Sequence, residues 1–119
     1  MDASVLGKLC ADWPGVSSII KWDDDLVFSV ASKMFVILCL HGPDRGRLSF
    51  KIEPERFLAL SDQPGMMPAP YIARAFWISV IEPQRFGDAL LAAHVRQSYA
   101  LVRAKLSKKI QSGLAALSD

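Results

Sequence analysis

The chain has 119 residues, of which 51% are hydrophobic and 22% are charged, and this length and composition fit one globular domain over residues 1–119 rather than a disordered segment. The formal net charge of +2 is too weak by itself to imply a polyanionic partner. The excess positive charge lies in residues 89–119, which hold five Lys or Arg against one Asp.

The first half of the chain predicts one helix followed by short strands. Asp2 can cap a helix whose apolar stripe reaches Cys10, and Trp13-Pro14-Gly15 ends it. Strands are expected at Ser17–Trp22, Leu26–Val30, Lys33–Leu40 and Arg47–Ile52, separated by the acidic run 23–25, the link 31–32 and the turn-rich loop 41–46. The last of these strands alternates apolar with polar residues, which indicates one buried and one wet face.

The second half predicts a helix, a strand and a longer helix. Pro54 suits the first turn of a helix that runs to about Leu60. Gln63–Pro70 holds three prolines and is expected as a stiff extended loop, and Phe76–Val80 as the last strand. Pro83 opens a final helix with an apolar stripe to Ile110. This order predicts an α+β fold in which helices pack on one face of an antiparallel sheet and leave the other face in water.

No pattern in the sequence predicts catalysis or metal binding. A nucleophile elbow, a glycine-rich phosphate loop and a zinc-helix motif are all missing. Cys39 and His41 share strand parity, but two ligands do not make a site. Three consecutive acids at 23–25 are usually solvated. We therefore expect no enzyme, no catalytic residues, no metal and no cofactor.

The sequence also predicts a cytoplasmic monomer that does not bind membranes. Charged residues at positions 2, 8 and 12 argue against a signal peptide. The longest apolar stretch, Leu26–Leu40, is interrupted by two serines and a lysine and is too short to span a bilayer. Cys10 and Cys39 lie in apolar surroundings and are expected as reduced thiols.

Several short motifs resemble the MmcQ/YjbR family in their order and spacing. They are Ser32-Lys33-Met34-Phe35, Leu48-Ser49-Phe50-Lys51, Gln63-Pro64-Gly65, Pro68-Ala69-Pro70-Tyr71, Trp77-Ile78-Ser79-Val80 and Ser98-Tyr99-Ala100-Leu101-Val102 with Lys105-Leu106. The resemblance runs from Pro14 to Lys109 and implies a CyaY-like, frataxin-type sandwich of the double-wing type, in proteins described as DNA-binding. The chain departs from the family at Ser107, where a proline is usual, and at Ala75-Phe76.

The resemblance and the polar strand face together predict a nucleic-acid surface made of Arg45, Arg47, Lys51 and Trp77. Cations beside an aromatic side chain can hold phosphates and stack on bases. With so little net charge, binding to DNA would be weak and dominated by phosphates. The alternative for Trp77 is burial under the loop from Met66 to Tyr71 with Lys51 stretched over it, which the usual burial of large aromatics favours.

A different class of function is also open. The Pro64–Tyr71 loop could cover a pocket for a small ligand or a protein partner, formed by Lys51, Tyr71, Trp77 and Tyr99. A frataxin-like iron role would need an acidic ridge, whereas the first helix region offers only Asp2 and Asp12. The cationic residues after His94, including Lys105, Lys108 and Lys109, are expected to be solvated at the end of the last helix.

Overall fold

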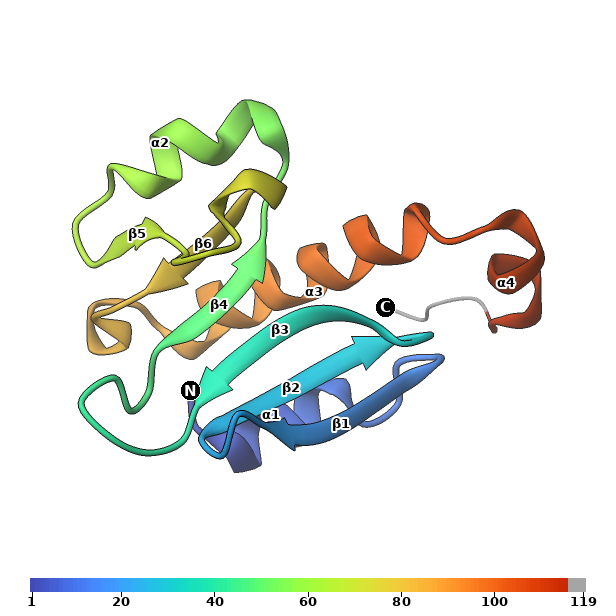
Figure 1. Cartoon of the computed structure of the whole chain (residues 1–119), viewed down its shortest axis with the longest axis horizontal. Coiled ribbons are helices and arrows are strands. Elements are labelled where there is room, and N and C mark those ends of the chain that lie inside the picture. Colours follow the sequence, from blue (N-terminus) through green and yellow to red (C-terminus); the bar gives the residue numbers. More distant parts are fainter. Residues whose placement is uncertain (116–119) are drawn as a thin grey trace.

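A six-stranded antiparallel sheet forms the centre of the structure, a computed structural model that describes residues 1–115 (Figure 1). The strands are β1 (Val16–Lys21), β2 (Asp25–Val30), β3 (Lys33–Cys39), β4 (Leu48–Lys51), β5 (Met66–Pro68) and β6 (Trp77–Val80). They lie in the order β1-β2-β3-β4-β6-β5, and every neighbouring pair is antiparallel. The predicted antiparallel sheet is confirmed.

Tight hairpins connect the first three strands. Ala31 and Ser32 join β2 to β3 with φ angles of 46° and 71°. Two consecutive residues with positive φ form the kind of turn whose twist matches that of the strands it joins. Trp22 and Asp23, with φ angles of 52° and 68°, turn the chain between β1 and β2. The backbone thus keeps these strands adjacent, as their close spacing in the sequence predicts.

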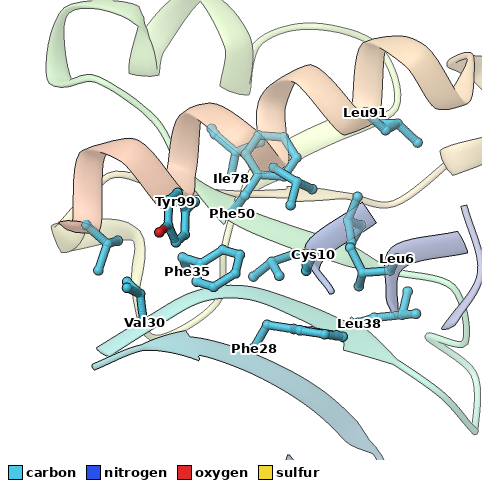
Figure 2. Packing of buried hydrophobic residues seen from close by; sticks show 14 of the residues in the cluster. Leu6, Cys10, Phe28, Val30, Phe35, Leu38, Phe50, Ile78, Leu91 and Tyr99 are labelled. Atoms are coloured by element: carbon cyan, nitrogen blue, oxygen red, sulfur yellow. The ribbon is translucent and has the colours of Figure 1, made fainter. Parts of the chain in front are cut away.

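Helices α1 (Ala3–Cys10) and α3 (Asp88–Ala104) cover the same face of the sheet (Figure 1). The side chain of Asp2 caps α1, because its carboxylate accepts a hydrogen bond of 2.9 Å from the Val5 amide. Both helices and the strands contribute to one buried cluster, which includes Leu6, Cys10, Phe28, Phe35, Phe50, Ile78, Leu91 and Tyr99 (Figure 2). This arrangement confirms the α+β fold with helices packed on one face.

A short helical segment covers the β5 end of the sheet. The 3-10 turn η1 (Pro54–Arg56) leads directly into α2 (Phe57–Ser61), which packs against β5 and β6. The Phe57 ring meets the Phe76 ring edge-on at a centroid distance of 5.7 Å. Phe57 and Leu60 also contact the main cluster. The helix predicted from Pro54 to about Leu60 therefore exists, with its first turn tightened.

The prediction of a stiff extended loop at Gln63–Pro70 is wrong in part, because three of its residues form a strand. Met66, Met67 and Pro68 form β5 and pair with β6 at the edge of the sheet. Proline lacks an amide hydrogen, but an edge strand has one side that forms no ladder, and a proline can be accommodated there. The proline content that suggested a loop is therefore compatible with a short edge strand.

The last helix is shorter than predicted. α3 ends at Ala104, and a separate helix, α4 (Lys108–Gly113), follows. Ser107 starts it, since its hydroxyl accepts a hydrogen bond of 3.2 Å from the Ile110 amide. Leu106 is buried while Ile110 is exposed, so the apolar stripe does not continue along one helix. The break lies at residues 105–107, between the two helices.

Phe76 does not belong to the last strand. It ends the 3-10 turn η2 (Ala73–Ala75) with a left-handed φ of 62°, and β6 begins one residue later. Its carbonyl still accepts a hydrogen bond of 2.8 Å from the Ile52 amide, beyond the end of β4. The predicted strand is thus shortened by one residue because the chain turns there. A further 3-10 turn, η3 (Pro83–Arg85), precedes α3.

Candidate functional site

The face of the sheet opposite α1 and α3, which we call the open face, carries the polar side chains of the strands. Directly opposed residues of antiparallel strands point to the same face. The register therefore places Ser49 beside Ser79 and Lys51 beside Trp77. The two serine hydroxyls are hydrogen bonded at 2.7 Å and buried. This is the arrangement that the alternation in β4 predicts.

A loop of residues 69–76, which we call the β5–β6 loop, lies over part of the open face. It is attached to β4 because the Lys51 ammonium donates a hydrogen bond of 2.6 Å to the Ala75 carbonyl. Its Ile72, together with Met34 of β3, borders two separate hollows. The open face is therefore not a flat surface, and its two hollows differ in chemistry.

The smaller hollow, of about 340 Å³, is basic, and we call it the lysine hollow. Three lysines line it: Lys33 at the start of β3, Lys51 at the end of β4, and Lys105 after α3. Trp77 and Leu106 contribute apolar surface, and no carboxylate is among its lining residues in the described part of the chain. Because three lysines and no described carboxylate line this hollow, its charge favours an anion.

The electrostatics of Lys51 agree with this description. Partial burial lowers the pKa of its ammonium from the usual range, and the nearby charge of Lys105 lowers it further. An anion bound between the two side chains would relieve that repulsion. The backbone amide of Lys51 is held by the Ser98 hydroxyl at 2.9 Å, which anchors the strand end to α3. The position of Lys51 is thus determined by β4 and the packing of α3.

The larger hollow, of about 590 Å³, has three aspartates among its lining residues, and we call it the carboxylate hollow. It lies between the β1–β2 turn, the β3–β4 loop and the β5–β6 loop. Asp24, Asp25 and Asp44 line it together with a single arginine, Arg47. Burial and the charge of Asp24 raise the pKa of Asp25, while Arg47 opposes the shift. Negative charge is therefore only partly compensated in this hollow.

The predicted wing, with Arg45 and Arg47, lies beside this second hollow. Arg45 is exposed in the loop between β3 and β4. Arg47 forms an ion pair of 2.7 Å with Asp44, and its charge is therefore partly neutralised. Because Arg47 and Lys51 flank opposite ends of β4, they line different hollows. The structure thus does not bring the four predicted nucleic-acid residues into one site.

Of the four residues predicted for a ligand pocket, only Lys51 and Trp77 share a hollow. Trp77 is buried, with 5% of its surface exposed, and it lies beside Ile72 and Ala75 of the β5–β6 loop. Tyr71 is fully exposed and lines the other hollow. Tyr99 lies in the core on the covered face, where its hydroxyl donates a hydrogen bond of 2.6 Å to the Pro14 carbonyl. The structure therefore does not bring these four residues together in either hollow.

Sequence reasoning missed Lys33 and Lys105 as members of a site with Lys51. Lys33 lies in a family-like motif, but its neighbours in the chain give no sign of where its side chain points. From the sequence, Lys105 is expected to be solvated like the other cations at the helix end. The signal that separates it from Lys108 and Lys109 is the adjacent Leu106, which is buried and turns this segment toward the sheet.

Other kinds of site find little support in residues 1–115. They contain no group of three or more His, Cys, Asp or Glu side chains that could hold a metal ion. The Cys39 thiol donates to the carbonyl of His41 at 3.2 Å, so this pair is held by a local turn. Cys10 is fully buried in the core, and this burial raises the pKa of its thiol to about 12. No helix in the described part of the chain is long and apolar enough to cross a membrane.

Comparisons with known proteins agree with this fold. A Deinococcus radiodurans protein with a DUF419 domain superimposes with a TM-score of 0.78 at 26% identity, covering 91% of this chain and 83% of that one. A Pseudomonas syringae protein has the same fold, with a TM-score of 0.69 at 20% identity, over 86% of this chain and 99% of its own. No curated protein matches the sequence. The family model described as YjbR matches residues 11–101, and the chain therefore belongs to the YjbR family.

Proposed function

We propose that this protein is a non-enzymatic nucleic-acid-binding protein whose main phosphate contacts lie in the lysine hollow. The observation that carries the proposal is that Lys33, Lys51 and Lys105 line one hollow that has no carboxylate among its described lining residues. Lysine ammonium groups donate hydrogen bonds to phosphate oxygens, and such contacts supply most of the affinity of proteins that bind nucleic acids without sequence preference. The resemblance-based expectation of DNA binding points to the same class of partner.

The surroundings of the hollow support contacts along an extended anion. Lys108 and Lys109 of α4 are exposed and lie three and four residues after Lys105 in the chain. Arg74 of η2 is exposed next to Ala75 of the hollow. In Figure 1, α4 continues beyond the C-terminal end of α3. A strand of phosphates crossing the lysine hollow could therefore meet further cations beside it.

The wing contributes less to this proposal than the sequence suggests. Arg47 is paired with Asp44, and Asp24 and Asp25 line the same hollow. These carboxylates would repel a phosphate that approached Arg47. Trp77 supplies apolar surface at the base of the lysine hollow, but its burial leaves little of the ring for stacking on a base. We therefore expect affinity that is weak, salt-dependent and largely independent of base sequence.

A matched pair of double variants tests the proposal. Lys33→Gln with Lys105→Gln removes two exposed lysines of the hollow, and Lys8→Gln with Lys21→Gln removes two lysines elsewhere. Fluorescence anisotropy with a labelled 20-bp duplex, at about 50 and 200 mM salt, should show wild-type binding that falls steeply with salt. Each neutralised phosphate adds about 0.9 to the magnitude of the slope of the logarithm of the binding constant against the logarithm of the salt concentration. If Lys33 and Lys105 each neutralise one phosphate, the magnitude of this slope should be smaller by about 1.8 in the first variant.

Three outcomes distinguish the parts of this proposal. Absence of binding by the wild type at low salt would exclude the function. An equal loss in the Lys8/Lys21 variant would show diffuse attraction rather than a site. A third variant, Arg45→Glu with Arg47→Glu, should weaken binding less than removal of the hollow lysines. A larger loss of affinity in this arginine variant would show that the main phosphate contacts are made by Arg45 and Arg47.

A further inference from the structure

We propose that the carboxylate hollow binds a small organic cation that combines an ammonium group with a flat apolar body. This inference is independent of the nucleic-acid proposal, because the two hollows are separate and their charges are opposite. It concerns a small-molecule site, whereas the lysine hollow suits a polyanion.

The size and lining of the hollow suit a small molecule. Its volume of about 590 Å³ lies within the range of ligand pockets, about 300–1,000 Å³. Met34 and Ile37 of β3 and Ala69, Pro70 and Ile72 after β5 form apolar walls. The hydrogen-bonded pair Ser49 and Ser79 supplies polar groups on the sheet below. Apolar walls with a few polar groups are the usual composition of a site that orients an organic ligand.

The charge of the hollow selects a cation. Asp44 is paired with Arg47, whereas within residues 1–115 no ion pair within 4.0 Å joins Asp24 or Asp25 to a cationic side chain. Both of these carboxylates line the hollow. The raised pKa of Asp25, caused by burial and by Asp24, indicates that a positive partner there would be favoured. A phosphate or carboxylate ligand would meet repulsion instead.

Two aromatic side chains at the rim extend this complementarity. Trp22 is 64% exposed in the β1–β2 turn, and Tyr71 is fully exposed in the β5–β6 loop. Large aromatics left in water at the edge of a hollow can stack on a flat ligand and attract a cation to their faces. The Lys21 ammonium already lies 5.7 Å from the centroid of the Trp22 ring, which shows that this ring is accessible to a cation. The aspartates therefore favour a positive charge on the ligand, and the two aromatic rings favour a flat apolar body.

A pair of probes that differ only in charge tests the inference. Phenethylamine is cationic at pH 7, and 2-phenylethanol has the same ring and chain with a neutral hydroxyl. Binding to the full-length protein can be followed by calorimetry and by the fluorescence of Trp22, which is exposed while Trp13 and Trp77 are buried. We expect saturable binding of the amine and at least about tenfold weaker binding of the alcohol, equal to about 1.4 kcal/mol.

Matched variants locate the site. Asp24→Asn with Asp25→Asn should weaken amine binding about tenfold and leave alcohol binding unchanged. Asp12→Asn with Asp62→Asn removes two exposed carboxylates outside the hollow and should have no effect. Thermal unfolding verifies that both variants are folded. Equal affinity for the two probes, equal losses in the two variants, or no saturable binding of the amine would each overturn the proposal.

Discussion

The two faces of the sheet differ in how their side chains are used. The covered face packs phenylalanines and aliphatic residues against α1 and α3, and residues such as Phe35, Phe50 and Ile78 are fully buried. The open face carries serines, lysines and carboxylates around two hollows. Stability therefore depends mainly on the covered face, and the chemistry available for binding lies on the open face. Substitutions on either face can therefore test this division between stability and binding.

The largest effect is expected on the covered face. Phe35→Ala should lower the free energy of unfolding by about 3–5 kcal/mol, because a buried ring is replaced by a cavity. Phe35 contacts the rings of Trp13, Phe28 and Tyr99. Ile37→Ala, in the same strand but on the partly exposed open face, should cost less than about 2 kcal/mol. Urea denaturation measures both, and equal losses would contradict the division of the two faces.

A smaller effect is expected where the covered face is joined to α3 by hydrogen bonds. The Ser98 hydroxyl donates to the Phe35 carbonyl at 2.6 Å and accepts from the Lys51 amide at 2.9 Å. Ser98→Ala leaves both groups without this partner and should cost about 1–3 kcal/mol. Ser18→Ala, at an exposed position of β1, should change stability by less than about 0.5 kcal/mol. An unchanged free energy of unfolding in Ser98→Ala would show that neither hydrogen bond contributes to stability.

The serine pair on the open face should have a still smaller effect. Ser49→Ala or Ser79→Ala alone leaves a buried hydroxyl unpaired and should cost about 1 kcal/mol. The double variant removes both hydroxyls and should be nearly as stable as the wild type. A double-mutant cycle measured by denaturation gives the coupling directly. Additive losses would mean that the two serines contribute independently and that the pair is not a unit.

The smallest effect is a pH dependence at the border of the core. Burial, and then the charge of Arg56, lower the pKa of His94 in the folded protein, and Glu53 opposes the shift. The unfolded chain therefore binds a proton first, so stability should fall as the pH drops through about 6.5, the ordinary pKa of histidine. His94→Gln should flatten this part of the stability curve between about pH 7 and 5. An unchanged slope would assign the dependence to other groups.

The elements that depend on short-range pattern could be predicted from the sequence. The alternation in β4 separates its two faces, and Asp2 caps the first helix as its position before an apolar stripe indicates. The apolar residues of α3 repeat at helical spacing and are buried as predicted. These features involve residues a few positions apart, whose relative directions follow from the geometry of a strand or a helix.

The contacts between residues far apart in the chain could not be predicted, because they depend on how the elements pack. Lys33, Lys51 and Lys105 share one hollow because β3 and β4 are neighbours and the segment after α3 returns to the sheet at Leu106. Tyr99 is excluded from any open-face pocket because α3 turns it into the core, and Arg47 is separated from Lys51 by the length of β4. Register, sheet order and helix placement set these distances, and they arise from packing among residues far apart in the chain.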